Sequence, residues 1–92
     1  MTDVDLWQVL LIRAARILAR DGWTQDGYYA GSRCSALGAL VEAAGRVDSP
    51  ALDEAILRLE KRVGRSIHVW NDQRGQTASN VIATLKDVAA LG

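Results

Sequence analysis

The sequence holds one cysteine, one proline and one histidine in 92 residues, and it has no phenylalanine. A single cysteine cannot form an internal disulfide, so a small scaffold held together by disulfide bonds is excluded. One cysteine and one histidine also fall short of the four ligands that a structural zinc site uses. We therefore expect a fold that depends on its own hydrophobic core, without a metal and without a cofactor.

Net charge is also lacking, because eleven basic residues balance eleven acidic ones. A neutral chain gains little from long-range attraction, so general binding to nucleic acid or to an anionic membrane is disfavoured. The longest apolar run, Val9 to Ile12, is far too short to span a bilayer. The segment from Met1 to Asp5 is acidic and lacks the basic start of a signal peptide. These features predict a cytoplasmic protein.

The apolar residues recur with the period of an α-helix along most of the chain. The expected main helices run from about Asp3 or Asp5 to Asp21, from about Cys34 to Gly45, from Pro50 to Gly64, and from Ala78 to Leu91. A shorter helix of one or two turns is expected within residues 66–72. At this length the chain is expected to form one domain over residues 1–92, a compact all-α bundle of four main helices plus one short helix.

Capping residues and glycines define the ends of these helices. The expected N-terminal caps are Thr2 or Asp3, Ser32 or Ser35, Ser49 before Pro50, and Thr77. Gly22 is expected to end the first helix in the left-handed conformation. Gly38 lies inside the second helix, where glycine costs roughly 1 kcal/mol relative to alanine. We therefore expect another backbone or a tryptophan ring to approach Gly38 closely.

The first helix is apolar over more than half of its circumference. Residues on this face are Leu6, Leu10, Ala14 and Ile17, with Trp7, Leu11 and Leu18 beside them. The opposite arc carries Arg13, Arg16 and Arg20, which we interpret as a solvated basic face rather than a contact to nucleic acid. So broad an apolar face predicts that this helix is the centre of the core, and it is consistent with a homodimer.

An aromatic, glycine-rich loop, Gly22 to Arg33, connects the first two helices. Tryptophan, tyrosine and arginine are the residue types that dominate binding hot spots, which makes Trp23, Tyr28, Tyr29 and Arg33 candidate contact residues. Because Tyr28 and Tyr29 are neighbours, they point in opposite directions in an extended segment, so that one can be buried while the other is displayed.

A second candidate site is the turn Trp70-Asn71-Asp72, which we expect to lie beside the aromatic loop. In one interpretation Trp70 stacks on a ligand while Asn71 and Asp72 bind its polar edge and Arg33 completes a site for a nucleotide-like molecule. In the other, Trp70 fills the core, and the two polar side chains bond the backbone of their own turn or cap the helix near Thr77. We favour the second interpretation, because turns select asparagine and aspartate for such bonds.

Cys34, His68 and Asp72 admit a third interpretation, as a nucleophile, a base and an orienting group. The expected helix start near Cys34 would lower a thiol pKa and so favour the thiolate. However, a cysteine packed as a small apolar residue and a solvated histidine explain the same residues without catalysis. We assign no catalytic residue and keep a Cys34/His68 enzyme as a remote alternative.

Several separated residues form one pattern, G-W…G…C-x-A-L-G-A…W-N-D. Its members in this chain are Gly22-Trp23, Gly27, Cys34 to Ala39 and Trp70-Asn71-Asp72, with Thr77 following. The pattern resembles a family of short uncharacterised proteins of actinobacteria and their phages, known as a domain of unknown function. The resemblance covers about Ala14 to Leu91. It implies an actinobacterial or phage setting and no particular activity.

Taken together, these features predict a small non-enzymatic module that binds a host protein or another copy of itself. In a phage, the module would be a modulator of a bacterial host protein. The alternative is a protein that binds a nucleotide-like small molecule through Trp70, Asn71, Asp72 and Arg33.

Overall fold

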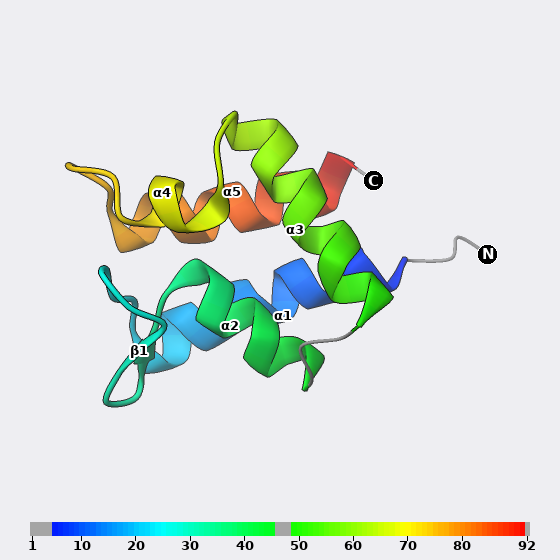
Figure 1. Cartoon of the computed structure of the whole chain (residues 1–92). Helices are drawn as coiled ribbons and strands as arrows, with labels where there is room; N and C mark the ends of the chain where they lie inside the picture. The colour runs from blue at the N-terminus through cyan, green and yellow to red at the C-terminus, as the bar shows by residue number, and fades with distance from the viewer. Residues whose placement is uncertain (1–4, 46–48, 92) are drawn as a thin grey trace.

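The computed structural model describes residues 5–45 and 49–91, and Figure 1 shows their arrangement. Its helices are α1 (Leu6–Asp21), α2 (Ala36–Ala44), α3 (Pro50–Val63), α4 (Ile67–Asn71) and α5 (Ala78–Leu91). The predicted all-α bundle of four main helices and one short helix is confirmed. Within the described ranges, no helix combines the length and the apolar character needed to cross a membrane.

The loop after α1 is more regular than predicted. Strands β1 (Tyr29–Ala30) and β2 (Arg33–Cys34) pair antiparallel, with Tyr29 opposite Cys34. Gly31 lies in the turn between them and has a φ of 65°, a conformation that favours glycine. Strands of two residues are too short to show the alternation by which a sequence reveals a strand. The sequence therefore predicts only an irregular loop where the structure has a small hairpin.

Three of the predicted caps are present. Ser35, Ser49 and Thr77 each accept a hydrogen bond from the backbone N–H three residues later, at 3.1, 3.2 and 3.1 Å. Each bond satisfies one of the free N–H groups in the first turn of its helix. Of the two candidates for α2, Ser35 is therefore the cap and Ser32 is not.

The two ends of α1 differ from the prediction. Asp5 occupies the N-cap position, while Thr2 and Asp3 lie outside the described residues. At the other end Gly22 has a φ of 99° and a ψ of 160°, so it is not in the left-handed helical conformation that we predicted. The physical reason is a backbone pairing: the extended ψ aims the carbonyl of Gly22 at the N–H of Cys34, 3.1 Å away.

The core is built around α1, which packs against α2, α3 and α5 (Figure 1). Leu10, Leu11, Ala14, Ala15 and Leu18 are all buried.

The first turn of α1 departs from this pattern. Leu6 is 58% exposed, so its predicted place on the buried face is wrong. Trp7 points inward instead, and the guanidinium of Arg58 lies 4.4 Å from the centre of its ring. The helices α2, α3 and α5 cover most of the apolar face of α1, from whose breadth we inferred a homodimer, and the homodimer itself stays a prediction.

Candidate functional site

The side-chain amide of Asn71 joins α4 to the loop that follows α1. Asn71 is the last residue of α4 and is 1% exposed. Its Oδ1 accepts hydrogen bonds from the indole N–H of Trp23 at 2.7 Å and from the backbone N–H of Ala36 at 2.9 Å. Its Nδ2 donates to the backbone oxygen of Thr24 at 3.1 Å and to Oδ1 of Asp72 at 2.9 Å. All four hydrogen-bonding positions of the amide are thus used inside the protein.

Neighbouring side chains extend this connection. The Nε2 of Gln25 donates to the backbone oxygens of Asn71 and Gln73, at 3.2 and 3.1 Å. From the other side, Oδ1 of Asp72 accepts the backbone N–H of Asp26 at 2.9 Å. The loop and the turn after α4 are therefore held together across 46 to 48 residues of sequence. We call this set the Asn71 clamp, formed by Trp23, Gln25, Asp26, Asn71 and Asp72.

The segment at Tyr28 is also held against the start of α2. The backbone oxygen of Tyr28 accepts the N–H of Ser35 at 2.9 Å. A Cβ atom added to Gly38 would lie 2.5 Å from the same oxygen, so a larger residue there would push the loop away. The predicted close approach of a backbone to Gly38 is therefore confirmed. The loop is positioned by α4 on one side and by α2 on the other.

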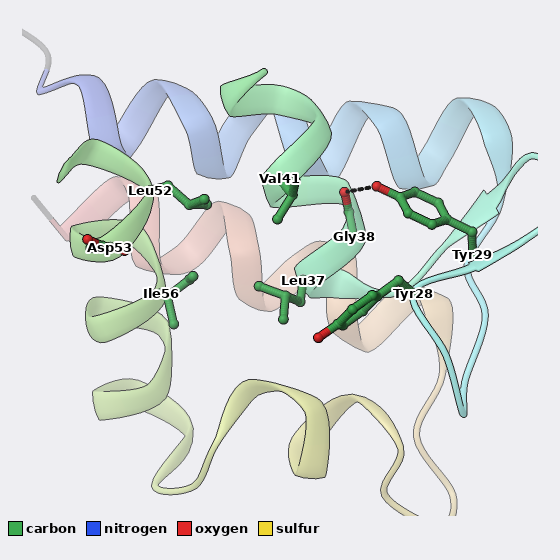
Figure 2. A pocket seen from close by; sticks show the side chains of 8 residues that line it. All are labelled: Tyr28, Tyr29, Leu37, Gly38, Val41, Leu52, Asp53 and Ile56. Atoms are coloured by element: carbon green, nitrogen blue, oxygen red, sulfur yellow. Dashed lines mark hydrogen bonds between the residues drawn. The ribbon is translucent and has the colours of Figure 1, made fainter. Parts of the chain in front are cut away.

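Both tyrosines of this loop are displayed. Tyr28 and Tyr29 are 59% and 53% exposed, so neither ring is buried, although the alternation of neighbouring side chains would have allowed one to be. Their rings diverge from the hairpin, and the hydroxyl of Tyr29 makes a long 3.5 Å contact to the backbone oxygen of Gly38 (Figure 2). The pKa of Tyr29 is raised, first by the partial loss of water around its hydroxyl and then by the nearby Cys34 and Glu42.

The two tyrosines border a hollow of about 420 Å³ between α2 and α3, which we call the tyrosine groove. Its other lining residues are Leu37, Gly38 and Val41 from α2, and Leu52, Asp53 and Ile56 from α3. In Figure 2, Leu52 and Ile56 lie across the groove from the α2 side chains, while the tyrosines lie at the end beyond α2. The lining residues are apolar apart from Tyr28, Tyr29, Gly38 and Asp53.

A second hollow of about 300 Å³ lies on the other side of Tyr28, which lines both. We call it the polar hollow, and its lining residues are Gly27, Tyr28, Ser35, His68, Asn71 and Asp72. Because the amide of Asn71 is already occupied by four internal bonds, the groups that remain to meet a ligand here are the imidazole of His68, the carboxylate of Asp72 and the Tyr28 ring.

The other predicted binding residues are divided between the core, the Asn71 clamp and the protein surface. Trp70 is 5% exposed and belongs to the core, as the favoured interpretation of its turn expects. Asn71 and Asp72, however, do not mainly bond their own turn. Asn71 accepts bonds from Trp23 in the loop and from Ala36 at the start of α2, and Asp72 accepts the backbone N–H of Asp26. Arg33 is exposed and lines neither hollow. Its side chain packs against Gly22, because a Cβ added to Gly22 would lie 2.6 Å from the Cγ of Arg33. The predicted set of Trp70, Asn71, Asp72 and Arg33 is therefore not assembled around one cavity.

Cys34 is packed as a small apolar residue. It is 1% exposed, and its thiol lies 3.7 Å from Oε2 of Glu42. Burial, followed by the charge of Glu42, raises the pKa of the Cys34 thiol, which opposes the thiolate that a nucleophile requires. His68 lines the polar hollow, whereas Cys34 does not. The geometry therefore gives no support to a Cys34/His68 pair.

Sequence reasoning did not identify the groove residues of α2 and α3. The helical period places Leu37, Val41, Leu52 and Ile56 on buried faces. The helix dipole explains Asp53, because an acid is favourable in the first turn of a helix. In the structure Leu37, Val41 and Ile56 are half-buried. A signal was present in the small residues of α2, because a thin helix leaves open space beside its neighbour.

The fold and the site together define a class of protein, a small helical domain whose aromatic loop is fixed to its fourth helix by a buried asparagine. The chain belongs to the family of unknown function DUF6197, whose model matches residues 5–91. Searches among curated proteins and among solved structures found no match. The resemblance inferred from the residue pattern is thus confirmed as membership of an uncharacterised family.

Proposed function

We propose that this protein is a non-enzymatic binding module that contacts a partner protein through the tyrosine groove. The observation that carries the proposal is the display of Tyr28 and Tyr29, 59% and 53% exposed, beside an apolar hollow. The Asn71 clamp holds the loop that bears them. Aromatic rings on a preorganised backbone offer a large contact area with little entropy left to lose on binding.

The walls of the groove supply the driving force. Leu37, Val41 and Ile56 remain half-buried in the free protein, so a partner side chain in the groove would remove further apolar surface from water. Such burial contributes about 25 cal/mol per Å² before the costs of association. Clusters of this kind, with aromatic residues around an apolar centre, are typical of binding hot spots.

The resemblance noted above adds a cellular setting to the proposal. In the cytoplasm of an actinobacterium, or of an actinobacterium infected by a phage, the partner is a host protein that the module modulates. Self-association through the same groove is the other form of protein binding, and it is distinguished by measuring the mass of the free protein in solution.

Differential capture tests the proposal. The tagged protein, a Tyr28→Ala/Tyr29→Ala variant and a Leu57→Ala control are used as baits in an actinobacterial lysate. Leu57 is 60% exposed on α3 but does not line the tyrosine groove, so it matches the tyrosines in exposure alone. We expect the wild type and the control to recover the same protein and the tyrosine variant to lose it. Equal recovery by all three baits contradicts the proposal.

A small apolar molecule is the second candidate occupant. It is favoured by the volume of the groove, about 420 Å³, which falls within the range of roughly 300–1,000 Å³ that is common for ligand pockets. The residues that we first assigned to a nucleotide-like ligand do not line this groove; they are Trp70, Asn71, Asp72 and Arg33. Native mass spectrometry of protein purified from an actinobacterial host tests this candidate, because a retained ligand adds a discrete mass that the tyrosine variant lacks.

A further inference from the structure

We infer that the partner segment in the tyrosine groove presents an apolar side chain next to a lysine or an arginine. This inference rests on the proposed function and specifies the chemistry of its partner. Each of the two hollows that Tyr28 lines has one acidic residue in its lining. Asp53 lies on α3, across the tyrosine groove from Tyr28 (Figure 2), and Asp72 lines the polar hollow. A partner segment that lies along the groove from Tyr28 to α3 therefore approaches Asp53 at the α3 end, with Asp72 in the hollow beyond Tyr28.

No positive charge offsets these acids at the two hollows. Among the described residues that line them, none is a lysine or an arginine, and His68 is the one basic side chain. Two other hollows on the surface have the opposite character. One is lined by Arg58, Lys61 and Arg62 together with apolar residues, and another by Arg13, Arg16 and Arg20 with one acid, Glu42. The two hollows that Tyr28 lines thus hold two acids and neither lysine nor arginine, although the chain as a whole has zero net charge.

Asp53 has a simpler explanation, which accounts for part of the pattern. It lies in the first turn of α3, where an acid stabilises the helix through the dipole. This explains why an acid is tolerated at that position, but not why cations are missing from the rest of both linings. Asp72 follows the end of the short helix α4 and is not in the first turn of a helix, so the dipole does not explain it. Its Oδ1 is fixed by hydrogen bonds from the backbone N–H of Asp26 and the side-chain amide of Asn71.

The apolar walls define the other half of the partner. A lone lysine or arginine leaves Leu37, Val41 and Ile56 in contact with water, whereas an aliphatic or aromatic side chain covers them. The neighbouring cation then lies near Asp53 or over the exposed Tyr28 ring, where a cation–π contact adds to the attraction. An amphipathic segment with basic residues meets both requirements, and charge complementarity also speeds and orients its approach.

A set of three peptides tests this inference on the intact protein. The peptides are capped at both ends and share the same two leucines, but the remaining positions carry lysine, glutamine or glutamate. Each is titrated into the ¹⁵N-labelled protein at low ionic strength, and the backbone amides of Leu37, Val41 and Ile56 report on the groove. We expect the lysine peptide to bind about 2- to 5-fold more tightly than the glutamine peptide, and the glutamate peptide to bind most weakly.

Two variants assign the preference to the groove. Asp53→Asn is expected to reduce the advantage of the lysine peptide over the glutamine peptide. Asp87→Asn removes an exposed acid from α5 and serves as the matched control, which is expected to keep the full advantage. Thermal unfolding of both variants verifies that they are folded at the temperature of the titration.

The outcomes separate this inference from the proposed function. Equal binding of the lysine and glutamine peptides at the groove overturns the inference and leaves protein binding by the groove intact. Failure of all three peptides to shift the groove amides overturns both. If the groove amides shift with protein concentration before any peptide is added, a second copy occupies the groove, which also overturns the inference.

Discussion

The indole N–H of Trp23 donates a 2.7 Å hydrogen bond to the side-chain oxygen of Asn71, 48 residues further along the chain. The same oxygen accepts the N–H of Ala36, the first residue of α2. One buried side chain thus fixes the loop after α1, the start of α2 and the end of α4 relative to one another. The position of Tyr28 and Tyr29 depends on this arrangement, because in the loop they lie between its clamped residues, Trp23 to Asp26, and the start of α2.

Replacing Asn71 by alanine is expected to lower the free energy of unfolding by about 2–4 kcal/mol. The reason is that alanine leaves the buried N–H of Ala36 and the indole N–H of Trp23 without their acceptor. Urea unfolding followed by circular dichroism measures the change. The control is Asn80→Ala on α5, where an exposed amide donates to Gln76, and its effect is expected to stay within about 0.5 kcal/mol. Equal losses in the two variants contradict the assigned role of Asn71.

A Gly38→Ala variant separates helix propensity from steric contact. Propensity alone predicts a gain of about 1 kcal/mol inside a helix. We expect a net loss of about 1–3 kcal/mol, because the new Cβ would lie 2.5 Å from the backbone oxygen of Tyr28. Gly27→Ala is the matched control, since its nearest neighbour, the backbone oxygen of Tyr29, is 4.0 Å away. A Gly38→Ala protein that is more stable than the wild type disproves the close approach.

The buried thiol of Cys34 is expected to resist modification in the folded protein. It is 1% exposed and its pKa is raised by burial and by Glu42, so both access and thiolate formation are reduced. Labelling with a chromogenic disulfide reagent should proceed only as fast as the protein opens, and it should accelerate with added urea. Rapid labelling of the native protein, at the rate of a free thiol, revives the nucleophile interpretation.

Stability is expected to fall at alkaline pH. The folded pKa of Cys34 lies above its ordinary value of 9.0, so the unfolded chain is the first to lose the thiol proton as the pH rises. The unfolded state is then favoured, and stability that is complete below pH 9 decreases as the pH rises toward the folded pKa. The raised pKa of Tyr29 acts in the same direction above its ordinary value of 10.0. A Cys34→Ala variant should show a shallower alkaline decline, and an unchanged slope contradicts the prediction.

Local chemistry made much of the fold predictable. Ser49 before Pro50, Gly64 and Thr77 mark helix ends through their own backbone preferences and side-chain bonds, which act within a few residues. Leu6 was misplaced because periodicity does not reveal where the first turn departs from the core. The hairpin from Tyr29 to Cys34 was missed because its strands have two residues each.

The candidate site was only partly predictable, since its key relationships are not local. The sequence placed the aromatic loop beside the Trp70 turn, which the bonds of Asn71 to Trp23 and Thr24 confirm. It did not reveal which donors would occupy the Asn71 amide, because those donors lie almost fifty residues away along the chain. The tyrosine groove depends on how α2 packs beside α3, and the spacing of apolar residues within one helix carries no such information.

Hydrogen exchange of the Trp23 indole proton, followed by NMR, tests the Asn71 clamp most directly. Our account predicts slow exchange, in the range of the helix amides of α1. The reason is that the indole proton is donated to the side-chain oxygen of Asn71, a buried residue 48 positions further along the chain. It also predicts that Asn71→Ala removes this protection under conditions in which α1 stays protected. An indole proton that exchanges in the wild type as fast as free tryptophan would show that the loop is not held, and would contradict the account.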